Sequence, residues 1–168
     1  MRIRKQVLTA TLCSLLLVGV GCSTPPQEGN RAGSVLETKE CSDCDLSGQN
    51  FEGADLAGAV LNGANLSNAN LKRANLEGAL LDSANLGGAD LGGANLSAIA
   101  LTQADLTGAN LTGANLKNAY LRGANFANAT LNNADFTGAD LNAADLTGAT
   151  LEGANFQGAI MPDGEVQN

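Results

Sequence analysis

The chain has 168 residues, a length typical of one domain, and its composition includes 21 Gly but only 3% aromatic residues. An ordinary globular core would need more bulky side chains, whereas a narrow solenoid can be filled by one residue type at a fixed spacing. The net charge of −8 opposes direct binding to nucleic acid or to anionic lipid headgroups. The absence of His removes a common catalytic base and zinc ligand.

The first 21 residues are predicted to form a signal peptide. Residues 1–5 are mostly basic, and residues 7–21 are mostly apolar and uncharged. An apolar run of about 15 residues is short for a membrane-spanning helix and suits the apolar region of a signal. Its removal would leave 6 basic and 17 acidic residues, a net charge of −11.

The segment Val18-Gly19-Val20-Gly21-Cys22 resembles the lipobox of bacterial lipoproteins. The resemblance implies cleavage before Cys22 and several acyl chains on that residue, palmitate among them. Stable anchoring takes more than one chain, because each buried CH₂ contributes only about 0.8 kcal/mol. Cleavage by an ordinary signal peptidase and an uncleaved anchor are the alternatives. We therefore expect an exported protein anchored by lipid in the periplasm, at the outer membrane or on the thylakoid lumen side.

Residues 22–43 are predicted to hold the lipidated Cys22, a flexible tether and the start of an N-terminal cap. The tether is expected over residues 23–38, which are polar and rich in Pro, Gly and Ser. Cys41 and Cys44 follow, and the oxidising compartment expected for an exported protein permits a disulfide between them. A structural loop or cap, free thiols and redox chemistry are the alternatives. A zinc site is not expected, because neither His nor a third free Cys is present.

An apolar residue recurs every five positions from Leu46 to Met161. The 24 positions hold 19 Leu, four Phe and one Met; Ala stands two residues before 21 of them and Gly two residues after 14. A period of five fits neither an α-helix nor a simple strand, and indicates a repeat architecture. Gly and Asn suit a turn with positive φ, so the chain is expected to turn a corner every five residues. Four corners close a lap of 20 residues.

Segments such as Ala64-Asn65-Leu66-Ser67-Asn68 and Ala104-Asp105-Leu106-Thr107-Gly108 resemble the A(D/N)LXX pattern of the pentapeptide repeat family. The resemblance covers residues 44–163 and is followed by a C-terminal tail, residues 164–168. It implies an all-β solenoid, a right-handed quadrilateral β-helix of about six coils, roughly 29 Å long at ~4.8 Å per coil. The central residue and the residue two before it point inward. The segment Cys41-x-x-Cys44-Asp45-Leu46, which leads into the first repeat, also resembles cyanobacterial members of the family.

Residues 20 apart should lie above one another, which sorts the outward side chains into four faces. On three faces the position before each central residue holds Asn, Asp or Thr, with no two Asp vertically adjacent. Amide stacking explains most of these polar residues. The fourth face carries an apolar series interrupted only by Asp140, namely Val60, Leu80, Ala100, Tyr120 and Ile160. It is interpreted either as a docking stripe or as β-prone residues on an exposed strand.

The C-terminal end is expected to stay open, because only seven residues follow Met161, too few for a capping helix. An open solenoid end exposes unpaired backbone groups. Phe156, Ile160 and Met161 are therefore candidates for an end-to-end contact with a second copy, giving a homodimer.

These features predict a non-enzymatic structural or protein-interaction module that binds an unknown protein through a face or an end. No cofactor, metal site or direct nucleic-acid binding is expected, and no catalytic residues are assigned, because the acidic residues lie on a solvated surface without a pocket. The alternative is a regulator of a topoisomerase that mimics DNA, since some pentapeptide repeat proteins resemble duplex DNA and bind gyrase. The export signal opposes that alternative, because gyrase is cytoplasmic.

Overall fold

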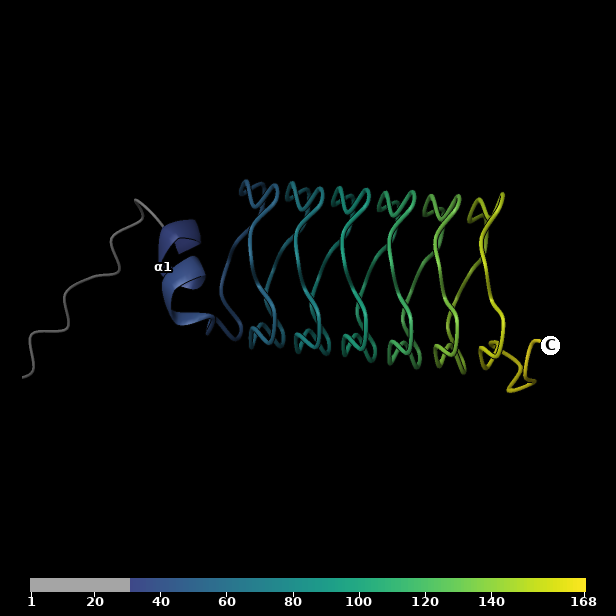
Figure 1. Cartoon of the computed structure of the whole chain (residues 1–168). Helices are drawn as coiled ribbons and strands as arrows, with labels where there is room; N and C mark the ends of the chain where they lie inside the picture. The colour runs from purple at the N-terminus through teal and green to yellow at the C-terminus, as the bar shows by residue number, and fades with distance from the viewer. Residues whose placement is uncertain (1–30) are drawn as a thin grey trace, which may run out of the picture.

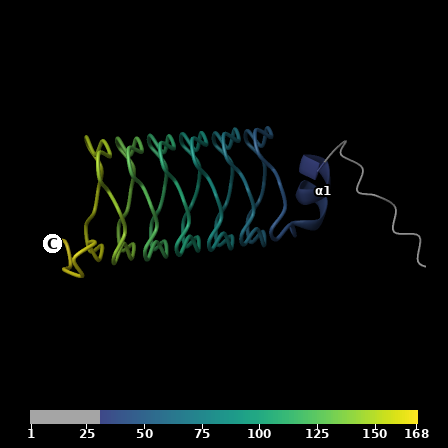
Figure 2. The same ribbon diagram turned by 180° about the vertical axis from the view of Figure 1, so that it is seen from behind.

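The computed structural model describes residues 31–168, which form a rod with one short helix at its N-terminal end (Figure 1). The helix α1 spans Arg31–Thr38, and every later residue belongs to the coiled stack or to the C-terminal tail. The view from behind shows the same regular stack with α1 and the C-terminus at opposite ends (Figure 2). The predicted signal peptide, Cys22 and the tether as far as residue 30 lie outside the described residues.

The stack is held by parallel β-bridges between residues 20 apart, beginning with Glu40↔Val60 and ending with Asp140↔Ile160. Within residues 31–168 the bridges are isolated, so each side contributes one bridging residue per coil rather than a strand of several residues. Backbone bonds run in both directions between laps: the Leu66 N–H donates to Asn85 O at 2.7 Å, and the Asn85 N–H donates to Ala64 O at 2.9 Å. The predicted lap of 20 residues is confirmed.

Each corner is a tight turn with a left-handed residue two positions after the central one. Gly63 has φ of 67° and Asn68 has φ of 56°, and the Ala69 N–H closes its turn on Leu66 O at 3.0 Å. The Asn or Asp before the central residue completes the corner, because its Oδ1 accepts the backbone N–H two residues later, as Asn85 does from Gly87 at 2.9 Å. Sequence reasoning assigned these residues to stacking and missed their role in the turn.

Ala143 occupies a left-handed corner with φ of 58° and is exposed. A Cβ atom strains this conformation by about 1–2 kcal/mol, and Gly relieves the strain at some cost in chain entropy. Ala143→Gly is therefore expected to raise the free energy of unfolding by about 0.5–1 kcal/mol in urea denaturation. Ala127→Gly is the matched control, because Ala127 is not among the residues with positive φ. A stability gain in the control, or none in Ala143→Gly, would contradict the strain argument.

The core is a column of apolar side chains inside the tube. Every central residue from Leu46 to Leu141 is at most 1% exposed, and most of the residues two positions before them are buried Ala that fill the remaining space. The Phe136 and Phe156 rings stack in this column with their centroids 4.9 Å apart, and the Phe126 ring meets Phe136 edge to face. The described residues include no buried polar or charged residue. The interior is therefore wholly apolar.

The N-terminal end differs from the prediction, because residues 31–38 of the expected flexible tether are helical. The Val35 side chain of α1 is 1% exposed and joins the core, with Ala32 packed beside it. A disulfide joins Cys41 to Cys44 directly after the helix, with the two Cα atoms 5.6 Å apart. The first bridge is made by Glu40, so the stack also begins before residue 44. Covering the apolar open end gives this short segment the burial that its polar composition does not suggest.

The C-terminal end was expected to stay open, but the tail covers part of it, because it folds back on the last lap. Val166 forms an antiparallel bridge with Ile160, and the Gly158 N–H donates to Gln167 O at 2.7 Å. The turn closes through the Gly164 N–H, which donates to Met161 O at 2.9 Å. One side of the last lap is thereby paired. The N–H groups of Leu146, Leu151 and Phe156 on the other sides find no backbone acceptor among residues 31–168.

Candidate interaction surfaces

The structure brings four of the predicted stripe residues together on the fourth face. Parallel bridges join Val60 to Leu80, Leu80 to Ala100, and Ala100 to Tyr120. Leu80 is 42% exposed and Tyr120 is 59% exposed, while Val60 and Ala100 are half-buried. These four residues are called the apolar stripe below. It is rigid, because each residue in it is bonded through its backbone to the preceding lap, as Leu80 is to Ala59 and Leu61, and the residues on either side of it in the sequence bond to the following lap.

Ile160 lies in the same column but is separated from the stripe by Asp140. The Asp140 carboxylate accepts from Arg122, whose Nε lies 2.6 Å from Oδ2. Arg122 is exposed over 63% of its side chain. One end of the stripe is therefore bordered by an ion pair, and Ile160 belongs to the C-terminal edge.

The other three faces use their polar side chains within the fold. Amide groups donate to the residue one lap earlier, as Asn65 does to Asp45 Oδ1 at 3.0 Å and Asn115 to Asn95 Oδ1 at 3.0 Å. Several Asp also accept from Lys: Lys72 Nζ lies 2.8 Å from Asp90 Oδ2. Residues 31–168 include no group of three His, Cys, Asp or Glu side chains that could hold a metal ion.

Local contacts lower the pKa of two Asp side chains on these faces, Asp55 and Asp145. The Ala57 backbone N–H and Lys39 hold the pKa of Asp55 below its ordinary value. The hydroxyl and backbone N–H of Thr147 do the same for the pKa of Asp145. Neither shift makes the group an acid or base at neutral pH, because a lowered pKa leaves the carboxylate deprotonated and weakly basic.

Because these pKa values are lowered in the folded state, the free energy of unfolding is expected to decrease at low pH. A carboxyl group with a folded pKa below its unfolded value, about 3.9 for Asp, stabilises the fold above that value. This stabilisation is lost as the pH falls through the folded pKa. Urea midpoints measured between pH 8 and pH 2 should stay level down to about pH 5 and fall below about pH 4.

Asp145→Asn provides the control for the acid dependence. The Asn keeps an oxygen that can accept the Thr147 N–H, now 2.8 Å from Asp145 Oδ1, but it does not titrate. The variant should show a shallower loss of stability in acid. A loss as steep as that of the unchanged chain would remove Asp145 from the explanation.

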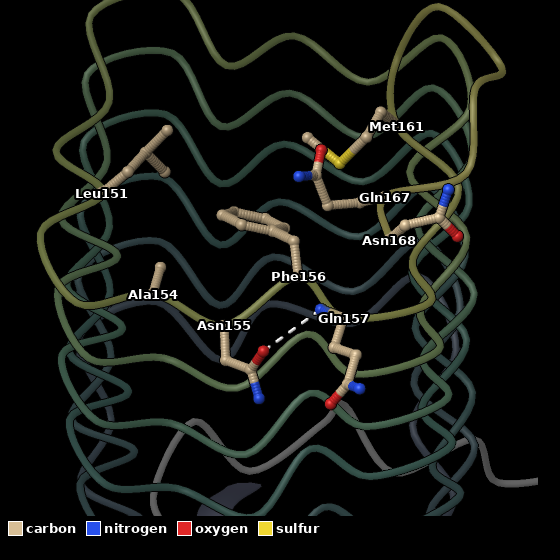
Figure 3. Close-up of a pocket in the computed structure, with 8 residues that line it drawn as sticks. All are labelled: Leu151, Ala154, Asn155, Phe156, Gln157, Met161, Gln167 and Asn168. Carbon is tan, nitrogen blue, oxygen red and sulfur yellow. Dashed lines mark hydrogen bonds between the residues drawn. The ribbon is translucent and has the colours of Figure 1, made fainter.

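The C-terminal end forms an open hollow of about 560 Å³. Figure 3 shows Leu151, Phe156 and Met161 directed into it, with Gln167 of the tail beside Met161. Leu151 is 39% exposed, and Phe156 and Met161 are half-buried. Ile160 does not line the hollow, because it points outward and pairs with Val166. This end therefore combines exposed core residues with the unpaired N–H groups described above.

No helix within residues 31–168 combines the length and apolar character needed to cross a bilayer. In the described part of the chain, exposed large apolar side chains lie on the stripe (Leu80 and Tyr120), at the C-terminal end (Leu151 and Val166) and on α1 (Leu36). The sequence had pointed to the stripe and to the C-terminal end, but it did not reveal that the tail covers one side of that end.

The comparisons with known proteins agree with this architecture. The family model for Pentapeptide repeats matches eight copies, over residues 40–78, 61–97, 100–138 and 124–161. Rfr23, a pentapeptide repeat protein from the cyanobacterium Cyanothece 51142, is 35% identical, with 73% of this chain and 90% of that chain covered and a TM-score of 0.34. No curated protein sequence matches significantly.

Two further solved structures are similar. A variant of QnrB1, a plasmid-mediated fluoroquinolone resistance protein, is 20% identical, with 73% of this chain and 79% of that chain covered and a TM-score of 0.50. A pentapeptide repeat protein from the Arabidopsis thaliana thylakoid lumen is 28% identical, with coverage of 75% and 70% and a TM-score of 0.40. The family match implies the right-handed quadrilateral β-helix expected from the sequence. The chain belongs to the pentapeptide repeat family.

Proposed function

We propose that the protein is a non-enzymatic protein-interaction module, exported and anchored by lipid on Cys22, which binds through the apolar stripe or the open C-terminal end. The observation that carries the proposal is the stripe. On the other faces the equivalent position is mostly occupied by side chains that hydrogen-bond to the fold, whereas Leu80 and Tyr120 are exposed. Exposed apolar side chains in a row on a rigid surface are typical of docking sites.

The anchor is supported by the sequence. The basic start, the apolar run and Val18-Gly19-Val20-Gly21-Cys22 resemble a lipoprotein signal. Because residue 31 lies at the α1 end of the rod, a lipid on Cys22 would attach at that end (Figure 1). The open C-terminal end lies at the opposite end of the rod.

The interaction is tested by crosslinking in the native membrane, followed by mass spectrometry of the captured proteins. Leu80→Asn with Tyr120→Asn should reduce capture without unfolding the rod, because Asn occupies this position on the other faces. Thr130→Asn with Thr150→Asn is the matched control, since Thr130 and Thr150 bridge each other on another face. Unchanged partners in the stripe variant would reject docking through the stripe.

The anchor is tested separately by mass spectrometry of the mature N-terminus. The expected product begins at Cys22 and carries acyl chains, and Cys22→Ala should release the protein from the membrane fraction. A mature chain that begins elsewhere, or an unmodified Cys22, would reject the lipid anchor while leaving the interaction surfaces unaffected.

A regulator that mimics DNA is the second candidate, supported by the net charge of −11 that remains after residue 21 and by the similarity in fold to QnrB1. The export signal favours the first proposal. Addition of residues 22–168 to a gyrase supercoiling assay discriminates between them. No change in supercoiling is expected, and inhibition that depends on the acidic faces would support the second candidate.

A further inference from the structure

Charged residues border the apolar stripe asymmetrically along the rod. Two positions after Leu80, Ala100 and Tyr120, the fourth face carries Asp82, Thr102 and Arg122, respectively. Backbone bonds keep these three in one column: the Ser83 N–H donates to Thr102 O and the Gln103 N–H to Arg122 O, both at 2.9 Å. The negatively charged Asp82 thus lies one lap before the level of Ala100, and the positively charged Arg122 lies one lap after it.

Both charged groups retain capacity for a partner. Asp82 Oδ1 accepts the Thr102 N–H at 2.8 Å, and a carboxylate has a second oxygen. The Arg122 ion pair with Asp140 involves Nε, and a guanidinium carries five N–H donors in all. At an exposed site this pair contributes little stability, so Arg122 can share its charge with a second carboxylate at small cost.

We infer that the partner of the apolar stripe is a second copy of this chain, docked antiparallel by a two-fold axis that passes at the level of Ala100. This inference rests on the proposed docking role of the stripe. In a two-fold contact the same patch serves both copies. Here Leu80 packs against the Tyr120 ring of the other copy, and Asp82 pairs with Arg122 of the other copy. The two-fold axis repeats each of these contacts with the roles of the two copies exchanged. Ala100 is small and lies at the axis, where its counterpart is another Ala100.

Other arrangements lose this match. In a parallel pair Leu80 lies opposite Leu80, and no carboxylate lies opposite a guanidinium. Moving the antiparallel axis by half a lap toward the N-terminus places Glu40 opposite Asp140, a pair of like charges. Moving it by half a lap toward the C-terminus places Leu80 opposite Asp140. The axis at Ala100 also places Val60 opposite Asp140, an acid whose charge Arg122 partly neutralises. Of these arrangements, it is the one that brings Leu80 opposite Tyr120 and Asp82 opposite Arg122.

The contact is small. The laps from Val60 to Asp140 extend over about 19 Å along the rod at ~4.8 Å per lap. A patch of this length on one narrow face falls below the ~1,200 Å² of total buried surface of most specific interfaces. The pair is therefore expected to exchange rapidly, and the experiment needs a probe that traps a short-lived contact.

Cysteine crosslinking in native membranes tests the orientation. Two differently tagged full-length chains, one with Leu80→Cys and one with Tyr120→Cys, should form a disulfide heterodimer when produced together. Neither should form a homodimer, because like residues would lie two laps apart, about 10 Å along the rod, beyond the ~7 Å Cα separation that a disulfide permits. A homodimer of the Leu80→Cys chain without the heterodimer would show a parallel pair and overturn the inference. Absence of both products would also overturn it.

A charge exchange tests the pairing, with Ala100→Cys as the reporter at the axis. Asp82→Arg brings two guanidinium groups face to face across each pair, and Arg122→Asp brings two carboxylates face to face. Each variant alone should therefore lose crosslinking by about tenfold. The two variants mixed restore both opposite-charge pairs and should recover it. A folding defect in either variant would not be rescued by mixing. Crosslinking that is insensitive to the two changes, or not restored in the mixture, would overturn the pairing.

The failure of this inference is distinct from failure of the proposed function. If copies do not crosslink but other proteins are still captured in a way that requires Leu80 and Tyr120, the second copy is rejected and the docking role stands. If the two Asn substitutions leave every captured protein unchanged, the docking role itself is rejected.

Discussion

Leu96→Asp is expected to leave the purified chain unfolded, or folded with its stack of laps interrupted in the middle. Leu96 is 1% exposed and lies inside the tube, where the described residues include no buried polar group. An ionised carboxylate there would cost several kcal/mol, which is comparable with the ~5–15 kcal/mol that stabilises an ordinary domain. Because each lap of a solenoid contacts only its neighbours, the defect also separates the laps on its two sides. Circular dichroism and limited proteolysis measure the loss of structure.

Gln103→Asp is the matched control for this prediction. It adds the same charge at an exposed corner with φ of 57°, a conformation that Asp tolerates well. The control should change stability by no more than about 0.5 kcal/mol. A folded Leu96→Asp protein with a protease pattern like that of the control would show that the interior accommodates charge, against the packing described above.

Leu116→Ala is expected to lower the free energy of unfolding by about 2–5 kcal/mol, because Leu116 is fully buried between laps and its removal leaves a cavity. Leu151→Ala makes the same chemical change in the last lap, where the side chain is already 39% exposed. Its cost should be about 1 kcal/mol, since less burial is lost and no closed cavity forms. Urea denaturation of both variants measures the difference.

Equal losses for the two variants would contradict the open C-terminal end. They would imply that Leu151 is covered in solution as completely as Leu116. A repeat of both measurements over a range of protein concentrations would then show whether a second copy supplies that cover, because association makes apparent stability depend on concentration.

The period of five predicted the interior of the rod and the composition of its faces. Once Leu46 and its successors are placed inside a lap of 20 residues, counting alone brings Val60, Leu80, Ala100 and Tyr120 into one column, as the bridges show. Such counting works because the corner geometry repeats without insertions. It also places Asp82 and Arg122 in one column, but the ion pair of Arg122 with Asp140 depends on side-chain conformations that no spacing specifies.

The two ends were less predictable, because they depend on tertiary burial rather than on the repeat. The α1 segment is only eight residues long and contains Gly, so local preference does not favour a helix, and burial of Val35 against the first lap explains it. The tail did carry a signal. Pro162-Asp163-Gly164 is a typical turn sequence, and Gly164 adopts φ of 87°. Seven residues are too few for a helix, but they suffice for a hairpin.

The strict lap length has a consequence for how this protein can lengthen or shorten. Duplication of a single five-residue unit would rotate everything beyond it by a quarter turn, so the residues that follow Leu80 in its column would emerge on a neighbouring side. Gain or loss of 20 residues would instead preserve every column. Lineages that retain a continuous outward apolar row should therefore differ in length by whole multiples of 20, whereas those that use only the interior are free to vary in steps of five.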